Sequence, residues 1–188
     1  MNDDDFADLV ESIQQARQIE RGELEPGRRF EFGPPDIKAM QTDLPPRRCA
    51  LCDSLASDSL AWRCACGGAY EYDWSPRFDP AQIVQGEWSQ WRYRSMLLPP
   101  GVPTESPVTL GEGMTPLVSL DFEGAPLTFK LEFLMPTGSY KDRGSSTLLT
   151  VLRAEGHSRL VEDSSGNAGA SIAASLEKGL PWSLSVAA

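Results

Sequence analysis

All four cysteines of the chain lie close together in the sequence, and their spacing restricts how the surrounding residues can fold. They form two close pairs, Cys49 with Cys52 and Cys64 with Cys66. Two chelating pairs of thiolates suit one tetrahedral zinc ion, and the Gly-Gly that follows the second pair allows a tight turn. Protein would fill all four ligand positions, so we expect a structural zinc in a zinc-ribbon-like module over residues 46–75. The alternative is a ribbon of four reduced thiols without metal.

Charge and hydropathy narrow the class of protein. The formal net charge is -10, and residues 1–25 hold eight acidic side chains against two arginines. An acidic chain repels phosphate backbones, so nucleic acid is not an expected partner. The sequence has no apolar run long enough for a membrane span and does not start with a basic stretch followed by an apolar one. We therefore expect a globular cytoplasmic protein without a membrane partner.

The N-terminal extension, residues 1–45, is predicted to be acidic and helical. Apolar residues recur at helical spacing over residues 5–21, and a glycine follows. The stretch 10–40 also resembles the arm that precedes the helix-turn-helix of some bacterial antitoxin-type repressors. Prolines and the cysteine cluster follow where that helix pair should stand. A regulatory chimera with an antitoxin-like arm stays open as an alternative function.

The remainder of the chain separates into a connector and an α/β domain. Residues 76–107 are rich in proline and aromatic side chains, and we expect them to wrap around the domain that follows. From residue 108 onward short strands alternate with helices. The predicted strands are 127–133, 159–162 and 182–186, and the predicted helices are 141–155 and 167–178. This pattern indicates an open α/β sheet with βαβ units, incomplete over residues 108–188.

Three ordered motifs in this domain carry chemistry. They are L-G-E-G-M-T-P-L at 110–117, P-T-G-S-Y-K-D-R-G at 136–144 and V-E-D-S-S-G-N-A-G-A-S at 161–171. Lys141 stands at a predicted helix start, where the positive helix end and partial burial favour a neutral amine that can attack an aldehyde. Asp142 and Arg143 are explained by helix capping and ion pairing. The loop 164–169 presents donors at the carboxyl end of a strand, where open sheets bind ligands.

Together these motifs resemble the threonine synthase family and its relatives of the tryptophan synthase β-chain fold. With the cysteine ribbon, the resemblance extends over most of residues 49–188. It implies that Lys141 carries pyridoxal 5'-phosphate as a Schiff base. It further implies that Asn167 contacts the 3'-hydroxyl of the cofactor ring, with Gly166 and Gly169 beside it. The resemblance also implies that Ser164 and Ser165 receive the substrate carboxylate. Glu112 and Thr115 are implied to form one wall of the site.

The resemblance implies a lyase of threonine biosynthesis that converts O-phosphohomoserine to threonine and phosphate. Another pyridoxal-phosphate-dependent lyase or dehydratase, or a non-catalytic binding protein, are the alternatives. The family holds the cofactor phosphate with a glycine-rich loop in a second half of the fold, and no such loop follows residue 169 here. We therefore expect a truncated chain, weakly active or inactive alone, or one completed by a homo-oligomer or a complementing chain.

Overall fold

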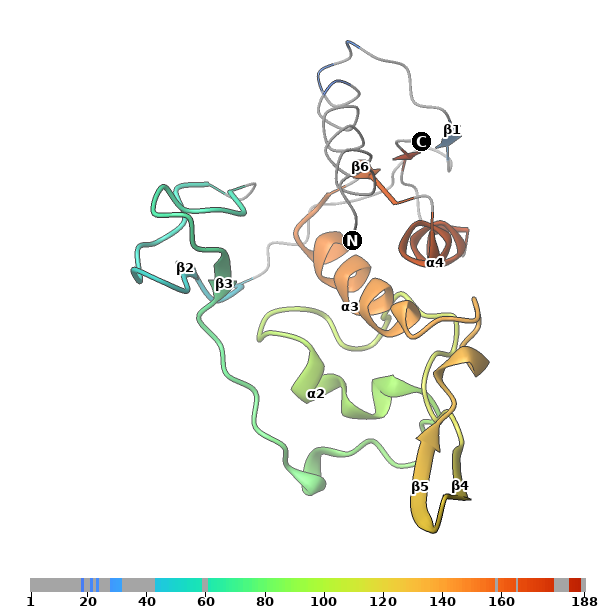
Figure 1. The fold of residues 1–188 in the computed structure, drawn as a ribbon. Helices are drawn as coiled ribbons and strands as arrows, with labels where there is room; N and C mark the ends of the chain where they lie inside the picture. Colours follow the sequence, from blue (N-terminus) through green and yellow to red (C-terminus); the bar gives the residue numbers. More distant parts are fainter. Residues whose placement is uncertain are drawn as a thin grey trace.

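The computed structural model describes residues 18, 21, 23, 28–31, 43–58, 61–157, 159–164, 166–177 and 183–186, with the backbone alone for 28–31 and 183–186 (Figure 1). Of the helix predicted over residues 5–21, the structure describes only residue 18, which is helical, and residue 21. Within the described parts of the chain, every helix is too short or too polar to span a lipid bilayer.

The cysteine module, residues 46–75, is built on a short antiparallel pair of strands. Strand β2, Arg47–Cys49, pairs with β3, Tyr70–Tyr72, so that Cys49 lies opposite Tyr70. The two glycines after the second cysteine pair both serve the turn. Gly67 has a φ of 93°, and a Cβ atom on Gly68 would lie 2.6 Å from the Cys49 Sγ atom. A side chain at Gly67 would therefore strain the turn, and one at Gly68 would displace the Cys49 side chain.

The connector carries three short helices, and the last two of them, η2 and α2, lie beside the long helix α3 (Figure 1). These are η1 at Pro80–Gln82, η2 at Gln90–Tyr93 and α2 at Arg94–Leu97. Trp91 is 1% exposed and packs with Leu98 and Val102 against Val151 of α3. Trp88, in contrast, is 76% exposed. The predicted wrapping of the connector is thus seen at Trp91 but not at Trp88.

A β-hairpin that was not predicted from the sequence follows the connector. Strand β4, Leu117–Phe122, pairs antiparallel with β5, Ala125–Lys130, through a two-residue turn in which both residues have positive φ. The strand predicted over 127–133 is wrong at its carboxyl end, because the 3-10 helix η3, Glu132–Leu134, begins there. One face of the hairpin is apolar and exposed, with Val118, Leu120, Phe122, Leu127 and Phe129.

The C-terminal part forms a βαβ unit, as predicted. Helix α3, Lys141–Ala154, is followed by β6, Arg159–Glu162, then α4, Asn167–Leu176, and β7, Ser183–Val186. Strands β6 and β7 are parallel, and β1, Arg28–Glu31, pairs antiparallel with β7 on its other side. The two helices pack side by side through a core of Val108, Leu149, Ile172 and Leu176 (Figure 1). This packing fixes the start of each helix relative to the sheet.

Candidate functional site

Lys141 is the first residue of α3, and a buried aspartate fixes the loop that leads into it. The Asp142 side chain is 1% exposed. It accepts hydrogen bonds from the Thr137 backbone N–H at 2.8 Å and from the Thr137 hydroxyl at 2.5 Å. The Lys141 N–H donates to the Ser139 hydroxyl at 3.3 Å. Asp142 is thus a structural carboxylate that ties residues 137–142 into one rigid turn.

The Lys141 side chain is exposed, so the partial burial predicted from the sequence is wrong. Its Nζ atom lies 5.1 Å from the centre of the Tyr140 ring, within the range of a cation–π contact. Burial raises the pKa of Glu162, Asp163 raises it further, and the Lys141 ammonium acts in the opposite direction. The structure therefore brings the lysine amine close enough to the end of β6 for its charge to act there, while the amine stays accessible to a ligand.

The loop between β6 and α4 packs tightly against the first turn of α4. The Gly166 N–H donates to the Ser164 hydroxyl at 3.3 Å, and Asn167 at the start of α4 is exposed. A Cβ atom on Gly169 would lie 2.0 Å from the Ser164 carbonyl oxygen, so glycine is required there. Ser165 lies outside the described residues. An exposed amide and an exposed amine thus stand at the first residues of two neighbouring helices.

An ion pair links the first turn of α3 to the segment after β5. Arg143 donates from Nε to Glu132 Oε2 at 2.8 Å and from Nη2 to Oε1 at 3.0 Å. The Thr115 hydroxyl donates to the same carboxylate at 2.6 Å. The Arg143 guanidinium, together with the Thr115 hydroxyl, lowers the pKa of Glu132 to about 2, although burial opposes this shift. Sequence reasoning foresaw an ion-paired Arg143 but missed Glu132, whose partner is eleven residues away in the chain.

Glu112 does not stand in an open wall, because its side chain is only 1% exposed. The carboxylate accepts hydrogen bonds from the connector, from its own loop and from α3. The glycine and proline punctuation of residues 110–117 gave no sign of this burial. The burial depends on the contact of this carboxylate with a tryptophan far away in the sequence. One sequence alone does not reveal such a contact.

The four cysteine sulfurs gather at one point of the cysteine module. All lie within 4.8 Å of one another, with Cys49 to Cys66 at 3.4 Å and Cys52 to Cys64 at 3.7 Å. The Ser54 hydroxyl lowers the pKa of the Cys64 thiol, to about 5 together with the Cys66 backbone. The Gly68 amide lowers the pKa of the Cys66 thiol, but Cys49 and Cys52 raise this pKa more strongly, to about 12. Four sulfurs at this separation suit one tetrahedral ion.

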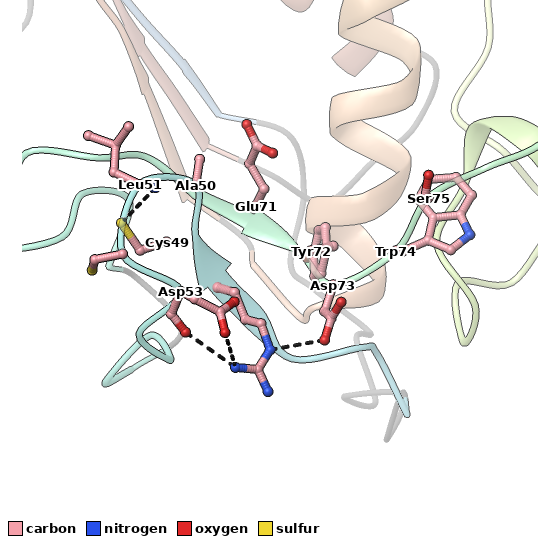
Figure 2. Close-up of a pocket in the computed structure, with 11 residues that line it drawn as sticks. Cys49, Ala50, Leu51, Asp53, Glu71, Tyr72, Asp73, Trp74 and Ser75 are labelled. Atoms are coloured by element: carbon pink, nitrogen blue, oxygen red, sulfur yellow. Dashed lines mark hydrogen bonds and ion pairs between the residues drawn. The ribbon is translucent and has the colours of Figure 1, made fainter.

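A cavity of about 570 Å³ opens beside this cluster (Figure 2). Arg48 is the cation in its lining, and it is already paired. Its guanidinium lies 3.4 Å from the Asp53 carboxylate and 3.0 Å from that of Asp73. The cation in the cavity wall is therefore already paired, whereas the Lys141 and Asn167 side chains are both exposed.

Comparison with known families bears directly on the site at Lys141 and Asn167. Residues 108–183 match the family described as pyridoxal-phosphate dependent enzyme. This segment belongs to the pyridoxal-phosphate-dependent enzymes. The match includes Lys141, the loop 164–169 and the helices α3 and α4 with the strand β6 between them. The predicted recognition of the family is confirmed, whereas the roles of individual site residues stay predictions.

Three curated relatives are all described as threonine synthase. That of Mycobacterium leprae is 42% identical over 73 residues, which is 37% of this chain and 20% of the relative. That of Halalkalibacterium halodurans is 38% identical over 96 residues, 46% of this chain and 26% of the relative. That of Methanocaldococcus jannaschii is 32% identical over 139 residues, which is 68% of this chain and 34% of the relative. The chain thus spans a fifth to a third of the length of these relatives. No solved structure matches the chain at a significant level.

Proposed function

We propose that this chain contributes the lysine half of a pyridoxal-phosphate-dependent lyase that acts as a threonine synthase. The observation that carries the proposal is the exposed Lys141 amine at the first residue of α3, inside the segment that belongs to the cofactor family. The three relatives described as threonine synthase support the substrate, O-phosphohomoserine, and the products, threonine and phosphate. Another lyase or dehydratase of the family would use the same lysine, so the identity of the substrate is the more specific part of the proposal and rests on the relatives alone.

The residues around Lys141 suit such a cofactor in chemical type. The bound cofactor would supply an electron-accepting ring. Lys141 would hold it covalently and, once displaced by the substrate amine, move protons at the substrate carbon atoms. The exposed Asn167 side chain offers an amide donor to the ring hydroxyl. Gly166 and Gly169 would keep the loop close to the ring, and Ser164 and Ser165 would receive the substrate carboxylate.

Full activity is proposed for an assembly that holds more of the fold than this chain does. Because the chain spans at most about a third of the relatives compared above, the contacts that hold the cofactor phosphate are expected in the part that it does not match. Charge-assisted hydrogen bonds contribute about 1.5–3 kcal/mol each, so their loss weakens binding by orders of magnitude. We infer that the 188-residue chain alone retains the cofactor weakly, and that a complementing chain with the phosphate contacts restores its retention.

The cysteine module is proposed to bind one structural zinc ion through Cys49, Cys52, Cys64 and Cys66. The mutual distances of the four sulfurs support this, and so does the complete set of protein ligands, which leaves no position for a catalytic water. The zinc would stabilise a module whose own strands are three residues long. We expect the protein to act in the cytoplasm, where reduced cysteines persist.

The proposed function is tested by adding pyridoxal phosphate to the protein and following the change in absorbance as its aldehyde condenses with a lysine amine. The Lys141 nitrogen bonds to the aldehyde carbon and water leaves, so the change requires this amine. We expect Lys141→Ala to lose most of the signal. Lys130→Ala is the matched control, because Lys130 is also exposed but donates to the Thr115 carbonyl and pairs with Glu132. Equal signals from Lys141→Ala and wild type would contradict the assignment.

A further inference from the structure

The buried Glu112 carboxylate stands at the junction of three segments of the chain. Its Oε1 atom accepts from the Trp91 indole N–H at 2.9 Å and the Gln90 amide at 3.4 Å, and it contacts the Ser146 hydroxyl of α3. Its Oε2 atom accepts from the Leu110 backbone N–H at 2.7 Å and the Thr109 hydroxyl at 3.0 Å. A buried carboxylate with five partners is the kind of group whose removal leaves several donors unsatisfied.

The same junction fastens the connector to the first two turns of α3. Gln90 donates its side-chain amide to the Arg143 carbonyl at 3.1 Å and to the Thr147 hydroxyl at 3.5 Å. The Gln90 backbone N–H donates to the Glu112 carbonyl at 2.8 Å. A Cβ atom on Gly113 would lie 2.4 Å from the Gln90 nitrogen, so the two backbones touch. The connector therefore holds α3 within one turn of Lys141.

We propose that Glu112, with Gln90 of the connector, is a positioning residue for Lys141. The proposal rests on the role of Lys141 in the proposed function and adds to it that the connector is part of the working site. Residues 76–107 lie outside the segment that matches the cofactor family. Glu112 acts through helix α3, because its partners Ser146 and Gln90 hold the turns that follow Lys141. A small displacement of a reacting group is enough to slow a reaction by orders of magnitude.

Glu112→Gln removes one acceptor while keeping the size of the side chain. Both carboxylate oxygens face a group that can only donate, the Trp91 indole N–H on one side and the Leu110 backbone N–H on the other. The NH₂ group of a glutamine must therefore point at a donor in either orientation. Gln90→Met is a milder second variant, because it keeps the Glu112 carboxylate and removes only the amide that reaches the Arg143 carbonyl.

The experiment compares labelling of Lys141 with labelling of Lys130 in the same protein. Each protein is incubated with pyridoxal phosphate, reduced with borohydride, digested and analysed by mass spectrometry, after circular dichroism has shown the same fold. We expect both Glu112→Gln and Gln90→Met to lower the Lys141 to Lys130 ratio, by about tenfold for Glu112→Gln. Glu105→Gln, an exposed carboxylate in the connector, serves as the control and keeps the wild-type ratio.

The outcomes separate this inference from the function on which it rests. A wild-type protein without preferential labelling of Lys141 would contradict the proposed function itself. Preferential labelling in wild type together with an unchanged ratio in Gln90→Met would overturn the positioning role, even where Glu112→Gln fails to fold. An unchanged ratio in a folded Glu112→Gln protein would overturn it as well.

Discussion

Tyr72 of β3 donates its hydroxyl proton to the Glu155 carboxylate at 2.6 Å, joining the cysteine module to the carboxyl end of α3. Burial raises the pKa of Tyr72 well above its ordinary value, and Glu155 raises it further. The Tyr72 ring also packs against the core that contains Trp91 and Ala154. Helix α3 is therefore held by the cysteine module at one end and carries Lys141 at the other (Figure 1).

Tyr72→Phe is expected to lower the free energy of unfolding by about 1.5 kcal/mol, because it removes a hydrogen bond to a carboxylate and keeps the ring. Urea denaturation followed by circular dichroism measures this. Tyr140→Phe is the control, since Tyr140 is 59% exposed, and it should change the free energy of unfolding by less than about 0.5 kcal/mol. Equal stability of Tyr72→Phe and Tyr140→Phe would show that the link between the module and α3 contributes nothing.

Glu132 should give the protein a dependence of stability on acid pH. Its folded-state pKa of about 2 lies below the ordinary value of 4.5, so its contribution is fully present above pH 4.5. That contribution is lost as the pH falls from about 4.5 to about 2. Glu132→Gln should therefore be less stable than wild type at neutral pH, with a difference that shrinks on acidification. Glu123→Gln, in the exposed hairpin turn, is the control. A difference that stays constant from pH 7 to pH 2.5 would refute the ion-pair account.

The zinc proposal predicts one zinc ion per chain in protein purified without chelator. Replacing Cys49 and Cys64 with serine removes two of the four thiolate ligands, so elemental analysis should find no stoichiometric zinc. Hydrogen exchange in residues 49–74 should rise in the same variant. Ser54→Ala is the matched control, because its hydroxyl lies 3.3 Å from both Cys52 and Cys64 without being a ligand. Wild-type protein that contains no zinc after purification without chelator would contradict the proposal.

Weak retention of the cofactor predicts how two related aldehydes label Lys141. If the contacts to the phosphate lie outside this chain, pyridoxal and pyridoxal phosphate should attach to Lys141 with similar preference. Each yield is normalised to the reaction of the same aldehyde with Nα-acetyl-lysine, which corrects for intrinsic reactivity. We expect the two normalised yields to agree within about tenfold, because a single phosphate contact is worth about that factor. A preference of several hundredfold for the phosphate form would place a phosphate site within these 188 residues.

Sequence reasoning worked where a local pattern decides the structure. Helix α3 was predicted over 141–155 and ends at Ala154, because its apolar period and its start after Gly138 are both local signals. Strand β6 was predicted with its observed bounds. The hairpin was missed because its two strands are exposed on both faces, and the Glu123–Gly124 turn was not recognised as its centre.

The burial of the candidate site residues could not be predicted from the sequence. Glu112 and Lys141 both stand in glycine-flanked motifs, yet the first is buried and the second exposed. The difference depends on Trp91 and Gln90, which lie about twenty residues before Glu112, and on Ser146 after it. Contacts of this kind depend on how the connector folds back on α3, and no periodic pattern encodes them.

The most direct test of the account is the distribution of cofactor among the four lysines of the wild-type chain, Lys38, Lys130, Lys141 and Lys178. Protein treated with a small excess of pyridoxal phosphate is reduced with borohydride, digested, and each modified peptide is quantified by mass spectrometry. The account predicts that most of the label is on Lys141. A label spread evenly over the four lysines, or concentrated on Lys130, would contradict it.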